Sequence, residues 1–141
     1  MAELEYKIME THTLESPITH KELDNWQTTG SAVMGKSNIV IVPELADKKG
    51  GIYNIFPNQD KDEWVIDVKI RIGNKDKSTK GGNGVGIYYL RNIDKGDIGD
   101  GLFGYSKRYD GIGVFLNSIL SSRDKKNKVE NYVQAFSNDG V

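Results

Sequence analysis

The segment from Trp64 to Ile72 constrains the fold more than any other part of this chain. Its apolar residues recur at every second position, which is the period of a β-strand with one buried and one wet face. This pattern predicts that Ile66, Val68 and Ile70 are buried. The charged residues between them are expected to be exposed: Asp67, Lys69 and Arg71.

Further runs have strand character because they are rich in β-branched or aromatic residues and are bounded by turn formers. They are Ser37 to Pro43, Gly84 to Leu90 and Gly111 to Asn117, with Gly51 to Phe56 and Tyr132 to Phe136 as weaker candidates. A short turn near Glu44 to Lys48 is the only helix-like stretch. The sequence therefore predicts an all-β fold, an antiparallel two-sheet β-sandwich.

Charge and length exclude several classes of protein. The 141 residues fit one domain, and 19 basic against 20 acidic residues give a net charge of -1. Such a balance supplies no field for nucleic acid or anionic lipid. No stretch reaches the roughly 20 apolar residues of a membrane span, so we expect no direct membrane insertion by this segment. The first residues, Met1 to Glu5, lack the pattern of a signal peptide, and the chain has no cysteine.

Catalytic signals are weak. The two histidines, His12 and His20, have no serine-centred or cysteine-centred motif near them. Acidic residues gather between Asp60 and Glu63, but these precede the alternating segment in a Lys-interleaved turn, and Asp67 is the only acid inside that segment. A glycosidase needs two carboxylates facing each other across a cleft. We therefore predict that the protein is not an enzyme.

Two loops look like ion sites but have the wrong spacing. Asp94, Asp97 and Asp100 do not alternate as the ligands of a helix–loop–helix calcium site do. The run from Gly81 to Gly86 leads into a strand, without the Lys-Ser/Thr pair or helix of a phosphate-binding loop. Its glycines are expected to allow a tight turn or the approach of a ligand.

Four groups of residues occur in one order along the chain. They are Asn25-Trp26 with Thr29-Gly30-Ser31-Ala32; Ile41-Val42-Pro43 with Lys49-Gly50-Gly51-Ile52-Tyr53-Asn54; Glu63-Trp64; and Gly82-Asn83-Gly84-Val85-Gly86-Ile87-Tyr88-Tyr89, followed by Phe103-Gly104 and by Tyr109-Asp110-Gly111-Ile112-Gly113-Val114-Phe115. Together they resemble the L-type (legume-type) lectin domain of cargo receptors that cycle between endoplasmic reticulum and Golgi. The resemblance implies a lead-in with a first strand over residues 1–22 and a lectin-like domain over residues 23–141.

The resemblance also implies a site. The family's domain is a concanavalin-like jelly roll that binds high-mannose glycans on its concave face with the help of calcium. Asn83 stands where the family usually has an aspartate that accepts hydrogen bonds from mannose, and asparagine keeps one carbonyl acceptor without the charge. Gly51, Asn117 and Ser121 are the other residues expected at the carbohydrate.

Calcium is expected from the family, but its ligands are degraded in this sequence. The family's aspartate, main-chain carbonyl and asparagine correspond here to Asn117, Ile119 and Ser121. A hard dication prefers several anionic oxygens, and these residues supply none from a side chain. We therefore predict no confident metal site.

The family's domain usually continues for about 80 to 100 residues past the turn at Gly140, so the chain reads as incomplete at its C-terminus. Strands Gly84 to Leu90 and Gly111 to Asn117 are then expected to lose neighbours, and a second chain or an oligomer is expected to supply missing strands.

The resemblance implies a carbohydrate-recognition module for glycoprotein cargo in the endoplasmic reticulum and Golgi lumen, with a partly degraded site. The alternative is a lectin-like structural or protein-interaction domain that no longer binds sugar. The partners are accordingly glycoprotein glycans or a protein.

Overall fold

The computed structural model describes residues 5–59, 62–73, 84–93, 101, 103–117 and 132–141. The chain divides into two compact units, Met1–Asp67 and Val68–Val141. Strands predominate in both, and every strand pair found is antiparallel. The all-β, antiparallel fold class predicted from the sequence is confirmed. None of the helices among the described residues has the length and apolar character that crossing a membrane requires.

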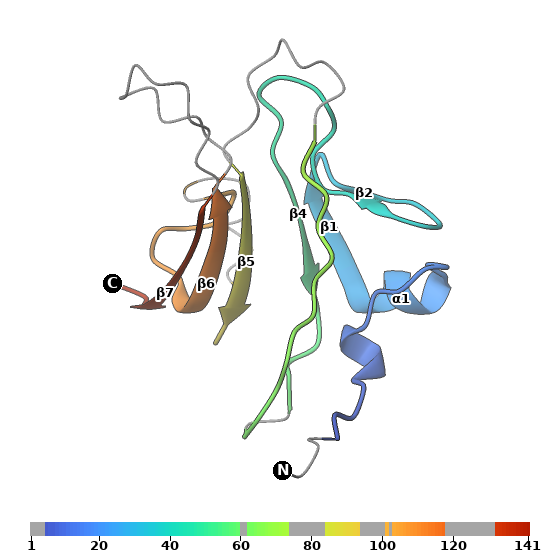
Figure 1. Cartoon of the computed structure of the whole chain (residues 1–141), viewed down its shortest axis with the longest axis horizontal. Coiled ribbons are helices and arrows are strands. Elements are labelled where there is room, and N and C mark those ends of the chain that lie inside the picture. The colour runs from blue at the N-terminus through green and yellow to red at the C-terminus, as the bar shows by residue number, and fades with distance from the viewer. Residues whose placement is uncertain (1–4, 60–61, 74–83, 94–100, 102, 118–131) are drawn as a thin grey trace. The chain divides into compact units, whose positions relative to one another are not determined.

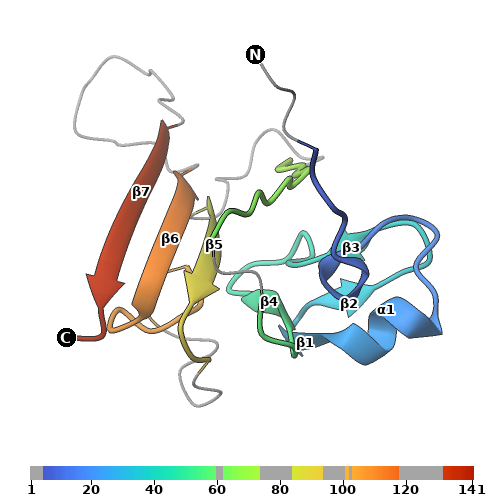
Figure 2. The ribbon, with the colours of Figure 1, turned by 90° about the horizontal axis from the view of Figure 1, so that it is seen from below.

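The described residues of the first unit form two small sheets, whose strands can be followed in Figures 1 and 2. Strand β1, Trp26–Gly30, pairs with β4, Gly50–Asn54. Strand β2, Val33–Met34, pairs with β3, Ile39–Val40, and the amide N–H of Gly35 donates to the carbonyl of Asn38 at 2.9 Å to close this hairpin. Of the strand predicted over 37–43, only β3 forms.

Two short helical segments precede β1. They are η1, Glu10–His12, and α1, His20–Asn25. Helix α1 begins after Thr19, whose amide N–H donates to the Glu22 carboxylate at 2.8 Å, as in a capping box. The predicted first strand within 1–22 does not form in the described residues, where the first strand is β1.

Among its described residues, the second unit forms a three-stranded sheet in the order β5-β6-β7, drawn side by side in Figure 1. The strands are β5, Gly84–Leu90; β6, Asp110–Asn117; and β7, Tyr132–Asp139. The predictions for β5 and β6 are confirmed almost residue for residue. Strand β6 pairs on both sides, so the expectation that it lies at an exposed edge is wrong. Among the described residues, β5 and β7 pair with β6 alone.

An aromatic cluster forms the core of this second unit. Tyr105, Tyr109 and Phe115 are buried, with Phe115 only 2% exposed, and three partly buried residues pack against them: Tyr88, Leu90 and Phe103. The Phe115 ring lies 5.4 Å from the ring of Tyr88, edge to face, and 5.3 Å from that of Phe103, stacked. Such geometries add to the stabilisation from burial.

Two glycines make room for these rings. Gly86 pairs with Phe115, and Gly113 pairs with Tyr88, so each glycine shares the aromatic face of the sheet. A Cβ on Gly86 would lie 2.8 Å from the Tyr88 ring, and one on Gly113 would lie 2.5 Å from the Phe115 ring. Gly86 therefore serves packing within the protein, which is a third role beside the turn and the ligand approach expected for this run.

The alternating segment at residues 64–72 does not behave as predicted. It has no assigned strand pairing, Val68 is 47% exposed, Ile66 is also exposed, and Ile70 is half-buried. Asp67, Lys69 and Arg71 are exposed as expected. Alternation specifies the two faces of a strand but not the neighbours that pair with it or cover it. The predicted burial of Ile66 and Val68 is therefore wrong.

Candidate functional site

The candidate site begins at one end of the three-stranded sheet. Asn117 is the last residue of β6, and the antiparallel register places it opposite Gly84, the first residue of β5, and Tyr132, the first residue of β7. Its Nδ2 donates a hydrogen bond to the Tyr132 hydroxyl at 2.7 Å. Three strand ends thus meet at the one predicted site residue of this unit that the structure describes.

Gly84 allows the backbones of β5 and β6 to approach closely here. Its φ is +135°, and a Cβ would lie 2.1 Å from the carbonyl oxygen of Leu116 and 3.1 Å from the Cα of Asn117. A residue with a side chain would be strained in that conformation and would push the strands apart. Gly84 directly follows Asn83 in the chain, and its contact with Asn117 therefore fixes the point where the glycine-rich run enters the sheet.

Three of the predicted site residues, Asn83, Ile119 and Ser121, lie outside the described residues. The aspartates considered as an ion loop, Asp94 to Asp100, also lie outside them.

Gly51 belongs to the first unit. It lies in β4 opposite Thr29, and a Cβ there would lie 3.0 Å from the Thr29 hydroxyl. Gly51 and Asn117 thus belong to different units of the chain. The contact shows why a small residue suits this place in β4, whether or not a ligand approaches it.

Tyr132 was not among the residues that the sequence predicted for the site, although its hydroxyl contacts Asn117. It lies on β7, is 44% exposed, and shares the Asn117 face of the sheet with Gln134 and Phe136. The weaker strand predicted over Tyr132 to Phe136 forms as the first part of β7. Its partner on β6 could not be read from it, because pairing joins residues 15 positions apart in the sequence.

Asn117 is the one predicted calcium position that lies within the described residues. Asn117 is neutral, and its amide nitrogen already donates to Tyr132. In the part of the chain that the structure describes, no group of three or more His, Cys, Asp or Glu residues could hold a metal ion. Ca²⁺ binds through several oxygens, many of them carboxylates, whereas Asn117 offers a single neutral carbonyl oxygen.

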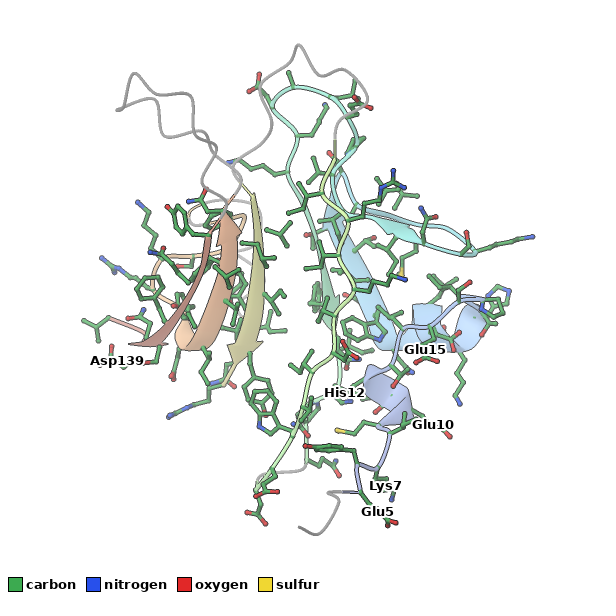
Figure 3. All side chains as sticks on the ribbon, in the orientation of Figure 1. Glu5, Lys7, Glu10, His12, Glu15 and Asp139 are labelled. Carbon is green, nitrogen blue, oxygen red and sulfur yellow. The ribbon has the colours of Figure 1, made fainter. Side chains whose placement is uncertain are left out.

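The histidine at position 12 has a structural role. His12 Nε2 lies 3.0 Å from the carbonyl oxygen of Phe56, and its Nδ1 lies 2.9 Å from the Thr11 hydroxyl. In addition, Asn54 Nδ2 donates to the carbonyl of Thr11 at 2.6 Å. Figure 3 shows His12 and Glu10 on the N-terminal segment. These hydrogen bonds hold the segment around η1 against the end of β4.

A hollow in the first unit is lined in part by two of the acidic residues between Asp60 and Glu63. Its volume is about 430 Å³, and it is lined by Tyr6, Asp62, Glu63, Trp64 and Val65. Asp62 and Glu63 are both exposed, and Asp60 lies outside the described residues. Neighbouring exposed carboxylates are not the facing pair of a glycosidase.

Comparison with known proteins identifies the family. The model of the Legume-like lectin family matches residues 5–141. This chain belongs to that family, as its ordered motifs predicted. No solved structure matches it at a significant level.

Individual relatives are more distant. The chain is 28% identical over 116 residues to the VIP36-like protein of Bos taurus, covering 82% of this chain and 32% of the relative. It is 23% identical over 133 residues to the vesicular integral-membrane protein VIP36 of Canis lupus familiaris, covering 92% of this chain and 36% of the relative. It is 26% identical over 107 residues to the protein ERGIC-53-like of Rattus norvegicus, covering 72% of this chain and 19% of the relative. The chain spans about a third or less of the length of these curated relatives.

Proposed function

We propose that this chain is a lectin-like glycan-recognition module that binds high-mannose glycans of glycoprotein cargo. The observation that carries the proposal is the arrangement at Asn117, whose amide lies at a strand end in register with Gly84 and Tyr132. Membership of the legume-like lectin family supports the proposal. The names of the relatives favour the secretory pathway, and we propose the endoplasmic reticulum and Golgi lumen as the compartment and a role other than catalysis.

The chemistry assigned to the site is hydrogen bonding between amides and hydroxyls. Asn83 would accept hydrogen bonds from sugar hydroxyls through its carbonyl oxygen, and Asn117 would orient the Tyr132 hydroxyl. In the first unit, Gly51 would leave the backbone of β4 accessible to a ligand. Hydrogen bonds to an amide are weaker than those to a carboxylate, so we expect weaker binding than an aspartate at position 83 would support.

We further propose that calcium is not a resident cofactor. A ligand that binds only the native state stabilises it by about 2.7 kcal/mol at a hundred times its dissociation constant, so millimolar calcium would reveal even a modest site. We expect no shift of the melting temperature with calcium. A shift of several degrees that Asn117→Ala abolishes would contradict this. Conversely, Asn117→Asp combined with Ser121→Asn should favour metal binding once a further acidic ligand is supplied.

Retention on immobilised mannose tests the glycan proposal. The chain should be retained with or without calcium and released by free methyl α-mannoside, and both Asn83→Ala and Asn117→Ala should abolish retention. Asn38→Ala, in the exposed loop between β2 and β3, is the matched control and should be retained like the unmodified chain. Thermal melts of each variant would separate loss of binding from loss of folding.

The second candidate is a lectin-like domain that has lost sugar binding and contacts a protein partner instead. The observation favouring it is the edge strand β7, which among the described residues pairs with β6 alone and exposes Val133 and Phe136. An unmodified chain that is never retained on mannose, but that sediments as a dimer or a larger species at micromolar concentration, would support this candidate and exclude the first.

A further inference from the structure

We propose that β7 carries an extended sugar-contact surface, formed by Tyr132, Gln134 and Phe136, which binds the pyranose rings of a neutral oligosaccharide beyond the sugar at Asn117. We call these three residues the β7 strip. The inference rests on the proposed glycan-binding function and extends the same site along the sheet.

The strip is continuous with the candidate site. Residues at every second position of a strand share a face, so Tyr132, Gln134 and Phe136 lie on the face that carries Asn117 and Phe115 on β6. Tyr132 contacts Asn117 through the 2.7 Å hydrogen bond. At about 3.4 Å per residue, the strip extends over about 14 Å, which is longer than one pyranose ring. It therefore suits an oligosaccharide better than a monosaccharide.

The chemistry of the strip is that of a sugar. A pyranose has apolar C–H faces and a rim of hydroxyls, and it complements exposed aromatic rings that alternate with groups able to donate and accept hydrogen bonds. Phe136, which is 51% exposed, and Tyr132 supply the rings. Gln134 supplies an exposed amide, and the Tyr132 hydroxyl, having accepted from Asn117, retains its proton for donation.

The lack of charged residues along the β7 strip favours a neutral ligand. No charged residue occurs between Tyr132 and Asn138, and the acidic Asp139 stands at the far end of the strand (Figure 3). The opposite face of β7 differs, because its first two residues, Val133 and Ala135, are apolar without aromatic rings. The combination of rings and amides is thus confined to the face that carries Asn117.

The strip is held in place from within the sheet. The Phe136 ring lies 6.1 Å from the buried Phe115 ring, and the Tyr109 hydroxyl donates to the Phe136 carbonyl at 3.3 Å. Because Tyr109 and Phe115 belong to the aromatic core, the backbone of β7 is positioned before any ligand arrives. Such preorganisation lowers the entropy that binding would otherwise cost.

Calorimetric titration of the whole chain tests the inference with two probes, methyl α-mannoside and a purified high-mannose oligosaccharide. We expect the unmodified chain to bind the oligosaccharide more tightly. Gln134→Ala and Phe136→Leu should each weaken oligosaccharide binding by up to about tenfold, and should change monosaccharide binding by less than about twofold. Val133→Ala and Ser137→Ala, on the opposite face of the same strand, are the matched controls and should leave both affinities unchanged.

Gln134→Ala is the decisive variant, because Phe136 touches the core and its replacement can disturb folding. One outcome is that the unmodified chain binds both sugars while Gln134→Ala keeps the full preference for the oligosaccharide. In that case the β7 strip does not contact the oligosaccharide, and the proposed function stands. If the opposite-face variants weaken binding as much as the strip variants, the assignment of the face is wrong. If the unmodified chain binds neither sugar, the proposed function fails, and this inference fails with it.

Discussion

The two units of this chain are stabilised in different ways. The second unit buries aromatic rings, Tyr105, Tyr109 and Phe115, against a three-stranded sheet. In the first unit, the described residues that are buried are only Ala32 and Asn25, and its sheets have two strands each. Two-stranded sheets are marginal in water without a packed face. The comparison shows that strand content alone does not produce a core.

Hydrogen bonds at strand ends take the place of a core in the first unit. The amide of Ile55 donates to the carbonyl of Asn25 at 3.0 Å, and that of Ser31 donates to the carbonyl of Lys49 at 2.8 Å. The indole N–H of Trp26 is buried and has no partner among the described residues. An unpaired buried donor is destabilising, so polar contacts stabilise this unit incompletely.

Truncating the centre of the aromatic cluster should produce the largest difference between the units. Phe115→Ala removes a buried ring and leaves a cavity, so the free energy of unfolding of the second unit should fall by about 3–5 kcal/mol. Hydrogen exchange measured by mass spectrometry reports each unit separately, and protection should be lost in β5 to β7 while β1 and β4 keep theirs.

Phe56→Ala is the matched control in the first unit, because Phe56 is 45% exposed. Its effect on stability should be clearly smaller than that of Phe115→Ala. Equal effects of the two variants would show that the aromatic cluster is not the main source of stability.

A smaller effect is expected from adding a single methyl group beneath the rings. Gly113→Ala would place a Cβ 2.5 Å from the Phe115 ring and 3.2 Å from the Tyr109 hydroxyl, and such overpacking typically costs about 1–3 kcal/mol. Gly73→Ala is the control, since a Cβ there meets nothing within 4 Å. Urea denaturation of the two variants should separate them, and indistinguishable midpoints would contradict the packing described for Gly113.

Alkaline pH should weaken the second unit through Tyr88. Burial, followed by the neighbouring hydroxyls of Tyr109 and Tyr105, raises the pKa of Tyr88 well above its ordinary value. The folded state therefore retains a proton that the unfolded chain loses above about pH 10, and stability should fall as pH rises through this range. Melting temperatures between about pH 9 and 11 should fall less in Tyr88→Phe than in the unmodified chain. Parallel declines would exclude Tyr88 as the cause.

The smallest effect is expected in the alternating segment. Because Val68 is 47% exposed, Val68→Ala should change the free energy of unfolding by no more than about 0.5 kcal/mol. A buried valine at this position, as the alternation predicts, would cost several times more. A chemical denaturation curve distinguishes an exposed from a buried Val68. A large loss in the free energy of unfolding would show that Val68 is buried, as the sequence pattern predicted.

The sequence predicted most accurately the strands whose ends carry strong turn signals. Gly84 to Leu90 and Gly111 to Asn117 begin with glycine and contain β-branched or aromatic residues, and they match β5 and β6 closely. Helix α1 was missed although Thr19 and Glu22 have the spacing of a capping box. Six residues are too few for helical periodicity to be recognised, and the capping residues were the only available signal.

For the candidate site, the sequence proposes Asn117 through its place in a family motif, and this assignment stays a prediction. It could not indicate the contact between Asn117 and Tyr132, because nothing near Tyr132 in the chain shows that its hydroxyl meets an amide 15 residues away. Only the register between β6 and β7 brings the two together. Strand register depends on pairing across the sheet and is not a property of either strand alone.

By itself, the sequence determined the class of fold, the family and the positions of the two best-defined strands, because these depend on local composition and on the order of motifs along one chain. Tertiary structure decided which apolar residues are covered. The regular alternation around Val68 remains exposed, whereas the less regular run around Phe115 forms the core, since glycines on the same face leave space for its rings. A sequence pattern specifies the apolar face of a strand. Burial of that face also requires a second surface that packs against it, and only the tertiary structure supplies this surface.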